Sequence, residues 1–237
     1  VFDYDEKVSL EASKSIREDA PDLSWVYLWY TDDAGHIAGN GAFFDEYVRK
    51  ADEQVARIWE AVKYREANFD EEWMIVVTTD HGRTENGHSR QSLRERTTWI
   101  STNLPVNDYF KSDRLAITDI APSICRFMGF GVPRDVLWEQ DGMPFIGDVD
   151  ICGLRTSPYD QSVELSWDCI SEKAEVAVYA ACDNKFKTGQ PDEWIKVAVV
   201  PAATRKYQVD LTSLPQSNFY KFVLVTPNNH LNRWLKR

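Results

Sequence analysis

No run of apolar residues in this sequence approaches the roughly 20 residues that a helix needs to cross a bilayer. The sequence is also short of cations, because 27 Lys and Arg residues face 38 Asp and Glu residues, which gives a formal net charge of −11. Binding to a nucleic-acid polymer or to an anionic membrane requires clustered cations, so the composition argues against both partners. An acidic protein that handles an anionic substrate needs locally placed cations, and bound metal ions meet that need.

Cysteine and histidine are scarce, with four residues of each. The cysteines are Cys125, Cys152, Cys169 and Cys182. Their positions show no C-x-x-C spacing, which argues against a zinc ribbon and against a dithiol redox motif. Cys169 and Cys182 would pair if they lay on adjacent strands, whereas buried free thiols are the simpler expectation. The sequence leaves the disulfide state open.

Apolar periodicity predicts alternating strands and helices in the first part of the chain. The runs Leu23–Tyr30 and Trp73–Val77 are short and rich in aromatic and β-branched residues, which is typical of buried strands. An amphipathic pattern from about Ala42 to Arg65 predicts a long helix between them. Further helices are expected over residues 3–22 and 114–128. Strand, helix and strand form a βαβ unit, so the two strands are expected to run parallel.

Candidate metal ligands follow both predicted strands. Asp32 and His36 lie in Y-T-D-D-A-G-H after the first, and Asp80, His81 and His88 lie in T-T-D-H-G-R-T-E-N-G-H after the second. Because the carboxyl ends of parallel strands meet at one edge of a sheet, the two groups are expected to converge there. Carboxylate oxygen and imidazole nitrogen are ligands that zinc accepts. Five such ligands exceed one four-coordinate ion and suit two ions about 4 Å apart.

These motifs resemble the alkaline phosphatase superfamily, and most closely its type I phosphodiesterase/nucleotide pyrophosphatase branch. The likeness rests on Y-T-D-D-A-G-H-x-x-G, on A-D-E-Q-V in the following helix and on V-V-T-T-D-H-G-R. The segment D-I-A-P-S-I at 119–124, with Met-Gly at 128–129, resembles one that these enzymes share with the sulfatases. The resemblance covers about residues 1–147.

The resemblance implies roles for the five candidate ligands. Asp32, His36 and His88 would hold one zinc ion, and Asp80 and His81 would help to hold a second. It also implies hydrolysis of small phosphate mono- or diesters through a covalent intermediate on a Ser or Thr nucleophile. The phosphoryl group of such a substrate needs a cationic contact.

Arg83 lies among the proposed ligands and is the candidate for that contact, because a guanidinium pairs well with phosphoryl oxygens. The structural alternative for Arg83 is a surface ion pair with Glu85 or Glu95.

The nucleophile implied by the resemblance cannot be placed in this chain. Enzymes of this type carry it, together with another metal-binding Asp, well upstream of the residue that corresponds to Asp32. Only 31 residues precede Asp32, and they are predicted to form a helix and a strand. The chain also starts with Val and shows no signal peptide. We therefore expect a C-terminal portion of a longer protein, inactive without its missing N-terminal part.

The sequence pattern changes after about residue 147. Short alternating strands are predicted over residues 162–167, 175–181, 193–200, 206–211 and 219–226. Such a series indicates a β-sandwich. The segments S-V-E-L-S-W-D and L-P followed by F-Y-K-F resemble the fibronectin type III strands that carry a core tryptophan and a buried tyrosine.

The predicted fold class is therefore α/β, with a mostly parallel sheet flanked by helices, alkaline phosphatase-like in part, over residues 1–150. An all-β, fibronectin type III-like sandwich is predicted over residues 151–237. The predicted function is a two-metal phosphoester hydrolase with two divalent ions, most simply zinc. An enzyme with an appended sandwich is expected to be exported to the periplasm, the cell surface or the medium.

Three other functions remain open at this stage. The first is a sulfatase of the same superfamily, which usually binds calcium. Calcium prefers an all-oxygen shell, so the histidines among the candidate ligands favour zinc over calcium. A phosphosugar mutase is disfavoured by the appended sandwich. A non-catalytic binding module, in which the sandwich acts and the metal site is vestigial, belongs to a different class of protein.

Overall fold

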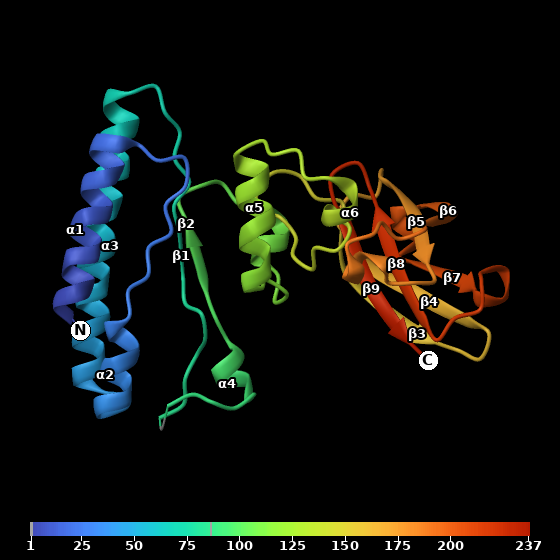
Figure 1. The fold of residues 1–237 in the computed structure, drawn as a ribbon, viewed down its shortest axis with the longest axis horizontal. Coiled ribbons are helices and arrows are strands. Elements are labelled where there is room, and N and C mark those ends of the chain that lie inside the picture. Colours follow the sequence, from blue (N-terminus) through green and yellow to red (C-terminus); the bar gives the residue numbers. More distant parts are fainter. Residues whose placement is uncertain (1, 86) are drawn as a thin grey trace. The chain divides into compact units, whose positions relative to one another are not determined.

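The computed structural model of the chain describes residues 2–85 and 87–237 and forms two compact units, residues 1–103 and 104–237 (Figure 1). The sequence also predicted a boundary near residue 150, between two parts that resemble different protein families. That boundary stays a prediction. In the described residues, no helix is both long and apolar enough to span a membrane.

Two long helices, α1 (Phe2–Asp19) and α3 (Ala42–Asn68), lie side by side and form the core of the first unit (Figure 1). Their buried apolar contact consists of Ile16, Ile58, Ala61 and Val62. A buried polar link adds to it, because the Gln54 amide donates to Glu6 at 2.9 Å. Both helices confirm the predictions made from apolar periodicity. Helix α1 ends just before Pro21, where a proline ring would clash with the preceding turn.

The strands of the first unit differ from the prediction. Strand β1 (Val76–Thr78) pairs with β2 (Ile100–Thr102), and the one-turn helix α4 (Leu93–Arg96) lies between them in the chain. The strand predicted at Leu23–Tyr30 is wrong, because residues 23–29 form no strand and Tyr30 already begins helix α2 (Tyr30–Ala38).

The predicted parallel sheet is also wrong, since every strand pairing within residues 2–85 and 87–237 is antiparallel. The reason is physical: an apolar run becomes a strand only where another segment accepts its ladder hydrogen bonds. The described part of the chain offers no such partner to residues 23–29. The Trp25 side chain consequently remains 83% exposed.

The second unit begins with short helices, which carry two buried polar side chains that accept backbone hydrogen bonds. These are the 3₁₀ turns η1 (Asp108–Lys111) and η2 (Ile117–Asp119) and the helices α5 (Ile120–Phe127) and α6 (Arg134–Leu137). The Asp119 carboxylate accepts the N–H groups of Met143 (2.7 Å) and Ala116 (2.6 Å), and Ser123 accepts the N–H of Phe145 at 2.9 Å. Burial raises the pKa of Asp119. The D-I-A-P-S-I segment is therefore structural.

Two antiparallel sheets make up the rest of the second unit, in the strand orders β3-β4-β7 and β6-β5-β8-β9. The strands are β3 (Ile151–Pro158), β4 (Ser162–Cys169), β5 (Glu175–Ala181), β6 (Ile195–Pro201), β7 (Lys206–Asp210), β8 (Phe219–Val225) and β9 (His230–Lys236). Short 3₁₀ turns interrupt them at η3 (Lys185–Thr188), η4 (Ala202–Thr204) and η5 (Leu211–Ser213). The predicted all-β C-terminal part is confirmed.

The centre of this all-β part is built around two aromatic side chains. Trp167 is 1% exposed and donates its indole N–H to the Ala202 carbonyl at 2.9 Å. The Tyr220 hydroxyl accepts the N–H of Ser217 (3.1 Å) and donates to the carbonyl of Pro215 (3.4 Å), a few residues upstream. Such a tyrosine bonded back to the preceding turn is a feature of immunoglobulin-like sandwiches.

All four cysteines are free thiols.

Candidate metal centre

Helix α2 places two of the predicted ligands on one face. Asp32 and His36 were expected in a loop after a strand, but they occupy positions i and i+4 of this helix, which project in the same direction. The start of the helix is held by Asp5 of α1, whose buried carboxylate accepts the N–H of Tyr30 at 2.7 Å. An anion at this end also interacts favourably with the helix dipole.

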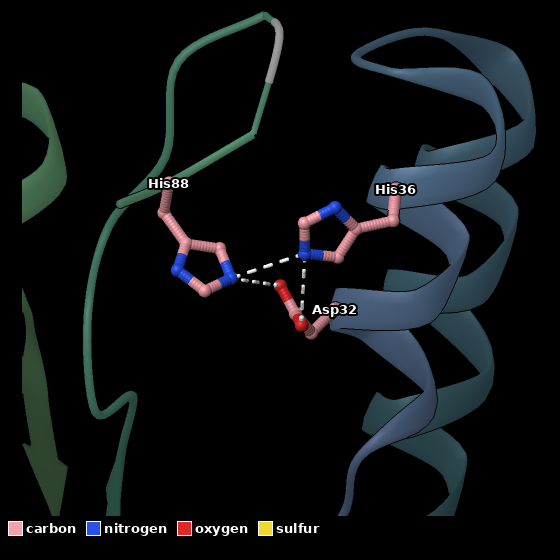
Figure 2. A group of neighbouring side chains, drawn as sticks. All are labelled: Asp32, His36 and His88. Carbon is pink, nitrogen blue, oxygen red and sulfur yellow. Dashed lines mark hydrogen bonds and ion pairs between the residues drawn. The ribbon is translucent and has the colours of Figure 1, made fainter. Parts of the chain in front are cut away.

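The loop after β1 brings His88 to the same point (Figure 2). A bridge between Thr84 and Gly87 narrows this loop just before His88. Gly87 has a φ of 111°, a conformation that favours glycine, and a Cβ there would lie 3.4 Å from Cε1 of His36. The glycine therefore allows both the turn and the close approach of the His36 ring.

Three ligand atoms converge in this cluster (Figure 2). The Asp32 carboxylate lies 3.2 Å from Nε2 of His88 and 3.4 Å from Nε2 of His36, and the two Nε2 atoms are 3.1 Å apart. A tetrahedral zinc ion with bonds of about 2.0–2.1 Å separates its ligand atoms by about 3.3–3.4 Å. The three observed separations therefore fit one face of a zinc coordination sphere. The side chains are 28–48% exposed, so an ion can enter from solvent.

Asp80 and His81, the other predicted ligands, lie next to this cluster without joining it. The His81 ring stacks on the His88 ring, with centroids 3.7 Å apart. Its Nδ1 donates to the Gly82 carbonyl at 2.9 Å, which leaves Nε2 without a proton in the neutral ring and directed away from that bond. Asp80 is 61% exposed, 3.6 Å from that Nε2. The two residues therefore offer a nitrogen and an oxygen beside the cluster.

The carboxylates of Asp32 and Asp80, which follow the two predicted strands, both affect the pKa of Tyr27. Partial burial, followed by the charges of Asp80 and Asp32, raises the pKa of Tyr27. A smaller contribution comes from Asp5. The carboxylates that follow the two predicted strands thus produce a common negative field, which favours the binding of cations.

Arg83 packs against the same helix as the ligands. Its guanidinium occupies the space beside Gly35, where an added Cβ would lie 1.1 Å from Nη1, and it lies 5.2 Å from the ring centroid of Phe44. All three guanidinium nitrogens are buried, and none has a hydrogen-bond partner among the described residues. A buried cation without a hydrogen-bond partner is costly, and the contact with the Phe44 ring offsets part of that cost.

Two carboxylates that support the site were not recognised in the sequence, namely Asp5 and Glu95. Asp5 gave no recognisable signal, because its partner at Tyr30 was assigned to a strand. Glu95 had a signal: Ser92-Leu93-Arg94-Glu95 has the spacing of a capping box, and the structure contains that box.

The sequence pattern that defines the type I phosphodiesterase/nucleotide pyrophosphatase family matches residues 2–123, slightly more than half of the chain. The chain belongs to this family and hence to the alkaline phosphatase superfamily, so that part of the predicted resemblance is confirmed. Phosphoester hydrolysis is the chemistry that this family indicates.

No curated protein matches the chain. Among solved structures, pectate lyase Pel3 from Pectobacterium carotovorum shares 24% identity at a TM-score of 0.26, over 37% of this chain and 26% of the lyase. The spore cortex lytic enzyme SleM from Clostridium perfringens shares 11% identity at a TM-score of 0.27, over 37% of this chain and 27% of SleM. The matches span about a quarter of those proteins, and at such TM-scores they do not bear on fold or function.

Proposed function

We propose that this chain forms part of a zinc-dependent hydrolase of small phosphate mono- or diesters, in which Asp32, His36 and His88 hold one ion. The observation that carries the proposal is the convergence of three ligand atoms at separations of 3.1–3.4 Å. Three protein ligands leave a fourth position open, as in catalytic zinc sites. Bound zinc supplies a Lewis acid that lowers the pKa of an attacking hydroxyl and stabilises the leaving oxygen.

Asp80 and His81 are proposed to contribute to a second ion. The support is the stacking of His81 on His88, together with the bond from His81 Nδ1 to Gly82, which frees Nε2 for a metal. Hydrogen bonding of one ring nitrogen commonly orients a ligating histidine. Two ions about 4 Å apart suit an in-line displacement at phosphorus.

Arg83 is proposed to contact the substrate. Its three unpartnered guanidinium nitrogens lie against the helix that carries Asp32 and His36. In a chain with a net charge of −11, such a cation counters the repulsion between the protein and an anionic substrate.

The Ser or Thr nucleophile is proposed to come from a part of the protein outside these 237 residues. The support is the segment 23–29, which forms no helix or strand and in which Trp25, Tyr27 and Trp29 alternate and are all more than half exposed. A strand from the nucleophile-bearing part would cover this face. The C-terminal sandwich, proposed to be fibronectin type III-like, then serves as a spacer or binding unit of an exported enzyme.

A substrate comparison tests this function. The complete protein is expected to cleave bis(4-nitrophenyl) phosphate or 4-nitrophenyl phosphate, to lose this activity on chelation and to regain it with added zinc. Cleavage of 4-nitrophenyl sulfate in preference to both phosphates contradicts the proposal and indicates a sulfatase. Absence of turnover with all three esters at saturating zinc also contradicts it and indicates a binding module.

A further inference from the structure

Glu95 makes an unusual number of hydrogen bonds for a side chain outside the metal cluster. The residue is 7% exposed, in helix α4. Its Oε1 accepts the N–H groups of Ser89 (3.0 Å) and Arg90 (2.8 Å). Its Oε2 accepts the N–H of Ser92 at 3.1 Å and also the Ser92 hydroxyl. The Ser92 hydroxyl first, and then the backbone N–H groups of Arg90 and Ser89, lower the pKa of Glu95 to about 2.

The main chain of Glu95 holds the other end of the same loop. Its carbonyl accepts the N–H of Gly82 at 2.9 Å. Gly82 packs so closely on helix α4 that an added Cβ would lie 2.0 Å from the Arg94 carbonyl oxygen. Gly82 directly follows His81, and Ser89 directly follows His88. Glu95 therefore binds the backbone of the residue that follows each of the two histidines of this loop, His81 and His88.

A capping box alone does not account for these contacts. Such a box needs only the reciprocal bonds between Ser92 and Glu95. The bonds to Ser89 and Arg90 lie outside the helix and contribute nothing to its cap. Their effect is to fix the backbone next to His88, whose imidazole lies 3.2 Å from Asp32 and 3.1 Å from His36.

We propose that Glu95 is a positioning residue of the metal centre, which sets the zinc affinity of Asp32, His36 and His88 without touching the ion. The inference rests on the proposed zinc site. The bonds that reach the loop run from the N–H groups of Ser89 and Arg90 to Oε1, so removing the whole carboxylate releases the backbone beside His88. Groups that orient a metal ligand typically change metal affinity by about 10–100-fold.

The test is a zinc competition titration against a chromophoric chelator with the complete protein. Glu95→Ala is expected to weaken zinc binding by about 10–100-fold, with zinc saturation still reached at higher concentration. The control Glu85→Ala removes an exposed carboxylate from the same loop and is expected to bind zinc like the wild type. Ser92→Ala removes the helix cap but keeps the bonds to Ser89 and Arg90, so it is expected to stay close to the wild type.

The outcomes separate this inference from the proposed function. Wild-type affinity in Glu95→Ala, or an equal loss in Ser92→Ala, overturns the positioning role while leaving the zinc site intact. A wild-type protein that binds no zinc overturns the site itself. If Glu95→Ala fails to fold, amide hydrogen exchange of the wild type decides: slow exchange at Ser89 and Arg90 supports the role, and fast exchange at both overturns it.

Discussion

Replacing Asp32 with asparagine is expected to reduce the zinc affinity of the protein by more than about 100-fold, beyond the range of changes that only orient a ligand. The Asp32 carboxylate contacts both histidines, at 3.2 Å from His88 and 3.4 Å from His36. It is also the anionic ligand of the cluster. The asparagine keeps the shape of the side chain but removes the negative charge, so the ion would be held by two neutral imidazoles and an amide.

Asp33 provides a matched control for this variant. It lies one position further along helix α2, outside the ligand cluster, so Asp33→Asn makes the same change of charge on the same helix. Isothermal titration with zinc is expected to show near wild-type affinity for Asp33→Asn and a large loss for Asp32→Asn. Equal affinities in the two variants would mean that zinc binds elsewhere or responds only to net charge.

The second large effect is expected in the β-sandwich unit, where Asp192→Ala should destabilise the fold by about 3–5 kcal/mol. Lys221 of β8 is 1% exposed, and its ammonium lies 2.7 Å from Asp192 and 2.6 Å from Glu139. Burial acts to raise the pKa of Asp192, but the Lys221 ammonium and the backbone N–H groups of Phe186 and Lys185 together outweigh it, so the pKa is lowered. Burial raises the pKa of Glu139 despite the same lysine. Asp192 is therefore the main counter-ion of Lys221.

Urea unfolding of three variants measures this effect. Asp192→Ala leaves the buried ammonium with Glu139 alone, whereas Glu193→Ala removes a neighbouring carboxylate that is 80% exposed and is expected to change stability by less than about 1 kcal/mol. Adding Lys221→Met to Asp192→Ala removes the buried ammonium that has lost one of its two carboxylate partners, and is expected to recover part of the loss. An Asp192→Ala protein as stable as Glu193→Ala would show that the buried ion pair contributes little.

The sequence predicted the elements whose apolar pattern is satisfied within the chain. Helices α1 and α3 bury their own stripes against each other, and the strands of the sandwich pair among themselves, so local periodicity was sufficient. The segment 23–29 has an equally strong strand pattern but no pairing partner in the described residues. Whether such a segment forms a strand depends on a pairing partner, which its own sequence does not reveal. The predicted parallel sheet included this segment and was wrong for the same reason.

The candidate site was predicted in part and for a partly wrong reason. Convergence of Asp32, His36 and His88 was expected at the edge of a parallel sheet, whereas a helix and a loop bring them together. The bond from Tyr30 to Asp5 and the bonds from Ser89 and Arg90 to Glu95 use main-chain N–H groups, which carry no sequence signature. Only the capping box between Ser92 and Glu95 had one. Burial of charge was equally hidden, as at Lys221, which is 1% exposed.

The most direct test of the zinc site is anomalous diffraction at the zinc absorption edge from crystals of the protein grown with zinc. A peak is expected about 2.0–2.2 Å from the carboxylate of Asp32 and from Nε2 of His36 and of His88. The absence of a peak between these three residues at saturating zinc, or a peak held by other side chains in its place, would contradict it.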